Sequence, residues 1–388
     1  MTDTTTTSGP SATTTNAGVL QPIGDIGRDA LRALGDAASA AGLDLAPPEP
    51  AVGLAAHLAS SCRTRALVVD LDAPGAASAL RAVRSAPEHA GLPVLAIAAP
   101  VTDLTFAELF ESGGDDVVAR GDEADLVPRL RALSSSHGAT TSTLTRGLAL
   151  VAAGDAAART TIARGLRSVG YDIHFAADGD ELHVAWAMRA PALVVIDASL
   201  PPSGGARELR IAREDGRTAP CVVTAAPRFA AETRATLAGC PRTIVHDAFS
   251  TPDGVVFLAN EVCAGDFADH RAAPRLLYGT RVWVRRAGAE RDVVGYTYTV
   301  SEGGVFVRTL AALSRDEEVW LELFPPRTSR RVRLAATVRW TRRFGRVGEA
   351  TSPAGMGLRI DGGLPGDLER HANGCRALAG ELGYGARR

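Results

Sequence analysis

The chain has 388 residues, of which 46% are hydrophobic and 22% are charged, and its formal net charge is −2. This length exceeds one ordinary hydrophobic core, so two or three domains are expected. The threonine-rich start over residues 4–16 lacks the apolar core of a signal peptide, and no apolar run of about 18 residues occurs elsewhere. We therefore expect a cytoplasmic protein without membrane insertion.

Charge and cysteine usage narrow the possible partners. Residues 265–388 contain 21 arginines and 14 acidic residues, a net charge of +7, whereas the preceding part carries −9; the chain has no lysine. The basic C-terminal part is therefore the candidate for an anionic partner. The five cysteines lack metal-ligand spacing, which indicates reduced thiols rather than a metal site or disulfides; they are Cys62, Cys221, Cys240, Cys263 and Cys375.

An apolar run that ends in aspartate and leads into a proline turn occurs twice. Residues 67–75 read LVVDLDAPG and residues 193–201 read LVVIDASLP, which places Asp70 and Asp197 one domain length apart. This spacing predicts an internal duplication of an α/β unit.

The first repeat predicts strands over 66–70 and 93–98 and helices over 76–85 and 105–112. The second predicts strands over 148–151, 171–176, 192–197, 221–224 and 244–245, and helices over 156–168, 180–188 and 206–212. Alternating strands and helices of this length are typical of parallel β-α-β units, and helices on both faces explain why the strands are continuously apolar.

The pattern changes after Cys263. Short β-rich segments are expected over 282–285, 293–300, 305–308, 318–324, 331–340 and 357–360. In the fifth of these, polar positions alternate with a face formed by Val332, Leu334, Ala336, Val338 and Trp340. Such segments predict a small antiparallel β-barrel, closed by a helix over 367–382.

The predicted organisation has five parts. They are a disordered tail rich in threonine and serine (1–17), a first α/β domain (18–133), a flexible linker (134–146), a second α/β domain (147–264) and a β-barrel domain with a C-terminal helix (265–388).

The α/β units resemble the receiver domains of response regulators in two-component signalling, which are flavodoxin-like and accept a phosphoryl group on a strand-end aspartate. In the second unit the likeness rests on residues 170–171, 176–179, Asp197-x-x-Leu200-Pro201 and Thr224. In the first it rests on Asp70-x-x-x-Pro74-Gly75 and residues 114–116. The resemblance implies that Asp197 and Asp70 are possible phosphoacceptors.

Other receiver residues are missing. Receivers bind Mg²⁺ through an acidic pair after the first strand and use a lysine after the fifth, because carboxylate and phosphate repel each other. Ala153-Gly154 replaces the acidic pair in the second unit, and residues 21–23 lack one in the first. At the lysine position we expect His246 in the second unit and Arg120 in the first. Where the second unit has the hydroxyl of Thr224, we expect Ala98 in the first.

These losses predict degenerate receivers that do not bind Mg²⁺ and undergo negligible phosphorylation. Two interpretations of Asp197 and Asp70 stay open. They either accept a phosphoryl group without a normal Mg²⁺ site, or act as strand-end caps hydrogen-bonded to loop amides.

Arg271-x-x-x-Arg275 precedes the first barrel strand, and Thr299-x-Ser301-x-x-Gly304 lies between two later strands. With these motifs the C-terminal part resembles the PilZ family of cyclic di-GMP receptors. The family pattern is RxxxR followed by [D/N]-x-S-x-x-G, and residues 338–340 and 355–358 extend the likeness. The resemblance implies that Arg271, Arg275, Thr299, Ser301 and Gly304 bind cyclic di-GMP.

The residue types suit this ligand, because guanidinium groups bind phosphates and guanine O6/N7 edges bidentately and also stack on bases. Thr299 departs from the family pattern. A threonine hydroxyl cannot accept the paired guanine N1 and N2 hydrogens, which is expected to cost about 1–3 kcal/mol. The alternative interpretation makes the arginines a solvated basic linker and residues 301–304 a plain β-turn.

We therefore expect a bacterial signalling adaptor that binds cyclic di-GMP. Its degenerate receiver domains would transmit this signal to other signalling or motility proteins. The alternative is a ligand-independent scaffold for protein interactions. No catalytic motif occurs, so no enzyme activity or tightly bound cofactor is expected. Acidic residues near the arginine-rich segment 327–346 favour a solvated face over a nucleic-acid site, and tryptophans in the barrel strands favour core or rim positions.

Overall fold

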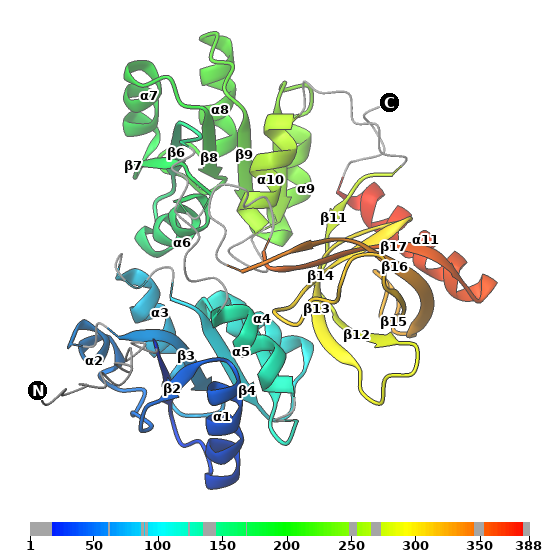
Figure 1. Cartoon of the computed structure of the whole chain (residues 1–388). Coiled ribbons are helices and arrows are strands. Elements are labelled where there is room, and N and C mark those ends of the chain that lie inside the picture. The colour runs from blue at the N-terminus through cyan, green and yellow to red at the C-terminus, as the bar shows by residue number, and fades with distance from the viewer. Residues whose placement is uncertain are drawn as a thin grey trace, which may run out of the picture.

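The computed structural model describes residues 18–60, 63–86, 89, 92–122, 125–134, 145–167, 169–247, 254–264, 273–344 and 353–382. These residues form three units, each built around its own β-sheet. Figure 1 shows the first α/β unit (blue to cyan) below the second (green), with the barrel (yellow to red) beside both.

The first unit is a five-stranded parallel sheet in the order β2-β1-β3-β4-β5. Its elements are β1 (Gly18–Ile23), α1 (Arg28–Ala40), β2 (Leu43–Leu45), α2 (Leu54–Ser60), β3 (Thr64–Asp70), α3 (Ala76–Ser85), β4 (Val94–Ala98), α4 (Asp103–Ser112), β5 (Asp116–Ala119) and α5 (Leu126–Ser134). The central strand ends at Asp70, as the sequence repeat predicts.

The second unit repeats this topology with the order β10-β9-β8-β6-β7, again all parallel. Its elements are β6 (Leu148–Ala152), α6 (Ala156–Arg167), β7 (Asp172–Ala176), α7 (Gly179–Met188), β8 (Leu193–Asp197), α8 (Gly205–Glu214), β9 (Cys221–Ala225), α9 (Pro227–Thr236), β10 (Thr243–Asp247) and α10 (Gly254–Cys263). Read from the second strand of each unit, both sheets have the order 2-1-3-4-5 of flavodoxin-like folds, which confirms the duplication.

Local sequence signals account for several helix starts. The hydroxyl of Thr102 accepts the amide of Thr105 at the start of α4, where the two residues form a reciprocal capping box. At the start of α7 the carboxylate of Asp178 accepts the amide of Glu181, whose own carboxylate accepts the amide of Ala177. Residues 176–179, which carry part of the receiver likeness, therefore join the end of β7 to the cap of α7.

The third unit is a closed six-stranded antiparallel barrel with one extra strand and a C-terminal helix. Its elements are β11 (Leu276–Leu277), β12 (Arg281–Arg286), β13 (Val293–Ser301), β14 (Gly304–Arg308), β15 (Glu318–Leu323), β16 (Val332–Arg342), β17 (Gly355–Gly363) and α11 (Pro365–Glu381). The sheet order is β11-β13-β12-β15-β16-β17-β14, and pairing of β13 with β14 closes the ring.

The alternation predicted for β16 holds except at its end. Val332, Leu334, Ala336 and Val338 are buried in the barrel core, whereas Trp340 is 38% exposed. The register of β16 against β17 shifts between Val338 and Trp340, and such a bulge turns the following side chains toward another face. The expectation that Trp340 shares the core face is therefore wrong.

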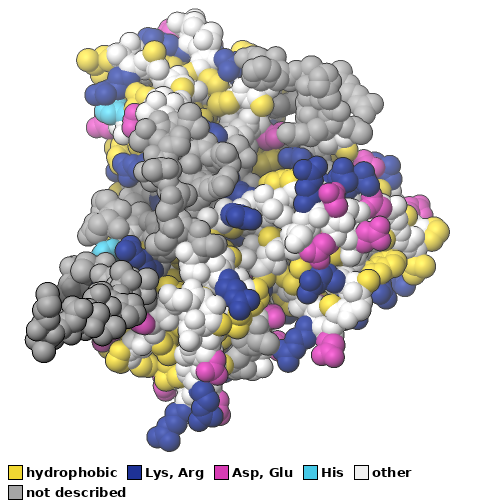
Figure 2. All heavy atoms as spheres, in the orientation of Figure 1, with side chains coloured by type: hydrophobic (Ala, Val, Ile, Leu, Met, Phe, Trp, Pro, Cys, Tyr) yellow, Lys and Arg dark blue, Asp and Glu magenta, His cyan; other side chains and the backbone are white. Residues whose placement is uncertain are grey.

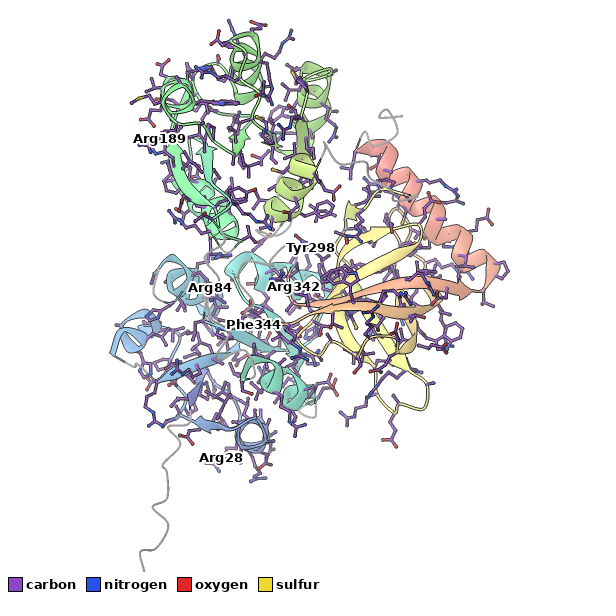
Figure 3. All side chains as sticks on the ribbon, turned by 45° about the horizontal axis from the view of Figure 1, so that its top comes forward. Arg28, Arg84, Arg189, Tyr298, Arg342 and Phe344 are labelled. Atoms are coloured by element: carbon purple, nitrogen blue, oxygen red, sulfur yellow. The ribbon has the colours of Figure 1, made fainter. Side chains whose placement is uncertain are left out.

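The barrel contacts both α/β units. Tyr296 belongs to the hydrophobic core of the first unit, while Tyr298 and Phe306 pack with the core of the second. Phe344, beyond β16, packs against the opposite sheet face of the first unit. Figure 3 shows Tyr298, Arg342 and Phe344 along this junction.

Arginine side chains lie over the barrel, but acidic side chains lie among them (Figure 2). The exposed ion pairs on this surface include Arg327–Glu381, Arg331–Glu322, Arg339–Asp316 and Arg359–Asp361. Among the described residues, no helix is both long and apolar enough to cross a membrane.

Candidate functional site

A hollow of about 370 Å³ lies on the barrel at the turn of the β13–β14 hairpin. Its walls come from the segment before β11, the hairpin itself, and the adjoining ends of β16 and β17; they include Arg275, Thr299, Ser301, Gly304, Phe306, Arg339, Trp340 and Arg359. Four of the five residues predicted to bind cyclic di-GMP therefore lie in one place. Arg271, the fifth, lies outside the described residues.

The predicted residues differ in exposure. Arg275 is exposed and directly precedes β11, so its side chain borders the hollow from outside. Thr299 is only 6% exposed, because Leu277 and Phe306 flank it on the two neighbouring strands. Ser301 ends β13 and is partly buried.

Backbone contacts hold the turn of the hairpin. The hydroxyl of Ser301 donates to the carbonyl of Gly304 at 3.2 Å, and the amide of Ile360 donates to the carbonyl of Gly303 at 3.0 Å. A Cβ atom on Gly304 would lie 2.7 Å from the carbonyl oxygen of Leu358. Glycine at this position therefore permits the close approach of β14 to β17.

His371 supports the turn from beneath, although no motif in the sequence marks it as a site residue. Its Nε2 lies 2.9 Å from the carbonyl oxygen of Ser301 and donates to it, because a carbonyl can only accept. The side chain is 1% exposed, and Nδ1 has no hydrogen-bond partner among the described residues. Burial lowers the pKa of His371, although the bond to Ser301 and the charge of Glu302 raise it in part.

An aromatic pair forms one wall of the hollow. The rings of Phe306 and Trp340 are stacked, with centroids 4.8 Å apart and an interplanar angle of 26°. Gly357 leaves the space that the indole occupies, because a Cβ atom there would collide with it. The exposed part of the indole thus borders the hollow as a flat apolar surface.

In the first α/β unit an arginine lies against the strand-end aspartate. The guanidinium of Arg120 donates to Asp70 at 2.6 Å and to Asp72 at 3.3 Å. Asp70 also accepts the amide of Asp72 at 3.2 Å and is 5% exposed. Burial lowers the pKa of Arg120, but the charges and hydrogen bonds of the two carboxylates raise it more.

The second unit has a different arrangement at the same strand end. One oxygen of Asp197 accepts both the amide of Ser199 at 2.7 Å and its hydroxyl at 2.6 Å. Asp155 accepts the amide of Ala158 at the start of α6. The guanidinium of Arg159 binds the carbonyls of Ala153 and Gly154, so a cationic group lies where receivers have the acidic pair.

Strand register corrects two positional assignments. Asp70 pairs with Ile97 as Asp197 pairs with Thr224, so Ile97, not Ala98, is the counterpart of Thr224. His246 pairs with Thr224 and thus corresponds to Val118 rather than to Arg120.

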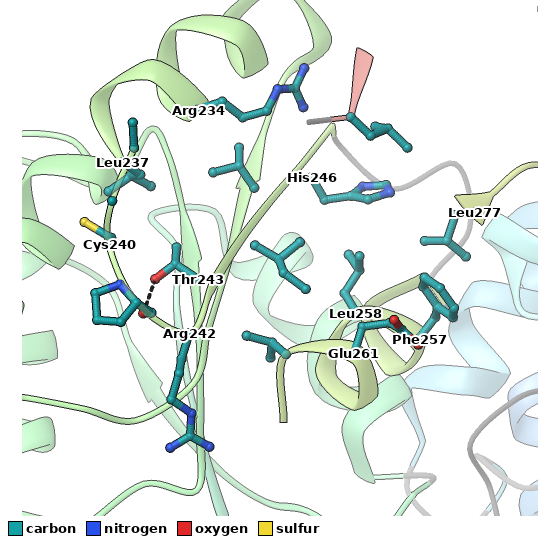
Figure 4. A pocket seen from close by; sticks show the side chains of 17 residues that line it. Arg234, Leu237, Cys240, Arg242, Thr243, His246, Phe257, Leu258, Glu261 and Leu277 are labelled. Carbon is teal, nitrogen blue, oxygen red and sulfur yellow. Dashed lines mark hydrogen bonds between the residues drawn. The ribbon is translucent and has the colours of Figure 1, made fainter. Parts of the chain in front are cut away.

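His246 borders a different hollow, of about 570 Å³, along α9, β10 and α10 (Figure 4). Its walls are mainly apolar and include Leu237, Phe257 and Leu258, with Leu277 and Leu382 contributed by the barrel unit. Among the residues that the structure describes, no group of three side chains is arranged to hold a metal ion.

Comparison with known proteins identifies the barrel unit. The family model of the PilZ domain matches residues 269–373, which include the barrel, most of α11 and both predicted ligand motifs. Residues 269–373 are a PilZ domain. No curated protein matches the chain.

Solved structures give weaker likenesses. The Bacillus subtilis inhibitor of motility (MotI/DgrA) is 20% identical over 31% of this chain, with a TM-score of 0.25, and the chain spans about half (54%) of that protein. A putative two-component response regulator/GGDEF domain protein is 20% identical over 64% of this chain and 98% of its own, with a TM-score of 0.29. The chemotaxis response regulator CheY4 of Vibrio cholerae is 19% identical over 30% of this chain and 98% of its own, with a TM-score of 0.26. The receiver-like fold of the N-terminal units rests on their strand order.

The buried imidazole predicts a pH dependence of stability. His371 has a lower pKa folded than its ordinary 6.5, so below that pH the unfolded chain binds the extra proton. Its contribution is therefore fully present above about pH 6.5 and is lost as the pH falls toward the folded pKa. Urea unfolding should therefore show a larger loss of stability between about pH 7.5 and about pH 5.5 in wild type than in His371→Gln.

The comparison with His371→Gln cancels the other histidines, and the amide still donates to Ser301. Equal losses in the two proteins would show that His371 is protonated as easily in the folded state as in the unfolded one.

Proposed function

We propose that the protein is a signalling adaptor whose PilZ domain binds cyclic di-GMP in the hollow at the β13–β14 turn. The observation that carries the proposal is that Arg275, Thr299, Ser301 and Gly304 line one hollow beside the exposed indole of Trp340. The family match supports the ligand class.

The chemistry of the hollow suits an anionic purine nucleotide. Arg275 directly precedes β11, so its guanidinium can pair with a phosphate or with a guanine edge. Trp340 offers a flat face for a base, and Arg339 and Arg359 add positive charge at the rim, balanced in part by Asp316 and Asp361. Arg271 is proposed to act with Arg275, as the family motif implies.

Thr299 limits the affinity in this proposal. Its position on β13 at the hollow is that of the family's aspartate or asparagine, and its hydroxyl cannot accept two guanine hydrogens at once. Thr299→Asn restores a carbonyl acceptor without adding a buried charge. Calorimetric titration with cyclic di-GMP should therefore show affinity about tenfold to a hundredfold higher for Thr299→Asn than for wild type.

Arg275→Ala is the matched loss-of-function variant and should abolish or strongly weaken the titration. Arg315→Ala, which changes an exposed barrel arginine that does not border the hollow, should titrate as wild type does. If neither wild type nor Thr299→Asn binds at high micromolar ligand, the receptor proposal fails.

We further propose that the α/β units act as docking modules without phosphorylation or Mg²⁺. In the first unit, Arg120 binds the carboxylate of Asp70. In the second unit, the guanidinium of Arg159 lies just after β6, the first strand of that unit. A tethered cation disfavours a Mg²⁺ ion at the same place, because the two charges repel each other.

Incubation with a small phosphodonor and Mg²⁺, followed by intact-mass measurement, should leave the mass unchanged. Arg120→Ala serves as a comparison that exposes the carboxylates of the first unit. A stoichiometric phosphoryl adduct on wild type, lost in Asp197→Ala or Asp70→Ala, would show a phosphoacceptor and contradict this proposal.

The second candidate function is a ligand-independent interaction scaffold, which Thr299 and the arginine-bound Asp70 favour. Either function implies protein partners, for which we propose other signalling or motility proteins in the cytoplasm. Neither requires an enzyme activity, a nucleic-acid partner or a tightly bound cofactor.

A further inference from the structure

The β13–β14 hairpin belongs to the barrel and contacts both α/β units. Its turn, residues 301–304, lies at the proposed nucleotide hollow, and Tyr298 in its middle packs edge-on against Phe257 of α10 at 6.2 Å. The open end of the hairpin lies against the first α/β unit. It is about 13 Å from the turn, because β14 rises about 3.3 Å per residue from Gly304 to Arg308.

Aromatic contacts anchor β13 at this open end. The ring of Tyr296 stacks on Phe106 at 5.0 Å and lies edge-on to Phe110 at 5.7 Å, and both phenylalanines belong to α4. Opposite Tyr296 on β14, the guanidinium of Arg308 lies 3.5 Å from the centroid of Phe110. Arg308 also donates to the carbonyl of Gly114 at 3.2 Å.

A buried carboxylate anchors the end of β14. One oxygen of Asp116, the first residue of β5, accepts the amide of Leu310 at 2.8 Å and the hydroxyl of Thr309 at 3.1 Å. The same oxygen accepts Nε of Arg129 at 2.9 Å, and Arg129 donates onward to the carbonyl of Val294 on β13 at 2.9 Å. Asp116, Arg129 and Thr309 are each at most 1% exposed.

This network holds both strands of the hairpin at once. Asp116 binds the chain just after β14, and Arg129 binds β13, so the ion pair between them fixes the two strands to one point of the first unit. Hydrogen bonds to charged groups in a buried site are strong and directional, so they resist displacement more than apolar contacts do. The twist of the hairpin, and with it the shape of the turn, is therefore constrained from the first unit.

We propose that Asp116 and Arg129 are positioning residues for the nucleotide site: they hold the open end of the hairpin and so keep its turn in the shape that binds ligand. The inference rests on the proposed function of the hollow. It assigns a role in ligand affinity to the first α/β unit, although that unit contributes none of the residues that line the hollow.

The chain offers a matched control at the same interface. Arg291 and Asp122 also join the barrel unit to the first unit, at 3.7 Å, but their side chains are 61% and 60% exposed. Exposed ion pairs of this kind contribute little. Arg291→Ala thus removes a contact between the same two units without disturbing the buried network.

The experiment compares full-length wild type, Asp116→Asn, Thr309→Val and Arg291→Ala. Cyclic di-GMP affinity is measured by calorimetry at a temperature at which every protein is fully folded. If the turn keeps its binding shape only a fraction of the time in Asp116→Asn, apparent affinity falls by that fraction, and we expect a decrease of about five- to tenfold. Thr309→Val should show a smaller decrease, and Arg291→Ala should match wild type.

Hydrogen exchange of the ligand-free proteins provides a second readout. Amides of residues 299–305 should exchange faster in Asp116→Asn than in wild type or Arg291→Ala, while amides of β15 and β16 should not change. A merely structural role would lower overall stability and leave both the affinity of the folded protein and this local difference unchanged.

Each outcome decides the inference. If wild type and Asp116→Asn bind equally, the inference is overturned while the proposed function stands. If wild type does not bind cyclic di-GMP, the proposed function fails, and unchanged exchange at residues 299–305 also overturns the inference. If Asp116→Asn does not fold, Thr309→Val, which keeps the Asp116–Arg129 pair, is judged by the same two readouts.

Discussion

Pairing of β13 with β14 is the constraint on which the remaining architecture depends. It closes the barrel, forms the turn at the proposed nucleotide site, and presents aromatic side chains to both α/β units. A single hairpin with these contacts cannot shift at one end without altering its packing elsewhere, because packed interiors are poorly compressible. The PilZ domain is thus the structural centre of the chain rather than an appendage to the receiver-like units.

The two α/β units show how a receiver-like fold can persist without the charges that its chemistry needs. In a chain without lysine, guanidinium groups from Arg120 and Arg159 lie at the strand ends where receivers gather carboxylates and Mg²⁺. Arg120, which two carboxylates hold, supplies positive charge where receivers bind a metal ion. Its guanidinium group is planar and tethered to the chain, so it is not equivalent to Mg²⁺. The strand-end aspartates are present in both units, while the charges around them differ from those on which receiver chemistry depends.

The sequence predicted what depends on local pattern. Apolar runs ending in aspartate identified β3 and β8, alternation identified most of β16, and spaced motifs placed Arg275, Thr299, Ser301 and Gly304 together. Short edge strands such as β5, with four residues, carried too little pattern to be found.

What was missed depends on three-dimensional contacts. His371 reaches Ser301 across 70 residues of sequence, and Thr309 reaches Asp116 across 193. No spacing rule links such pairs, because their proximity follows from how whole units pack. The bulge that exposes Trp340 also follows from pairing between β16 and β17 rather than from the alternation within β16.

Hydrogen exchange of the wild-type chain with and without cyclic di-GMP tests the central claim most directly. The account predicts that ligand slows exchange both at the turn, residues 299–305, and at the distant end of the hairpin, where Leu310 donates to Asp116. Slower exchange confined to the turn, or no change at either place, would contradict a hairpin that joins the nucleotide site to the first α/β unit.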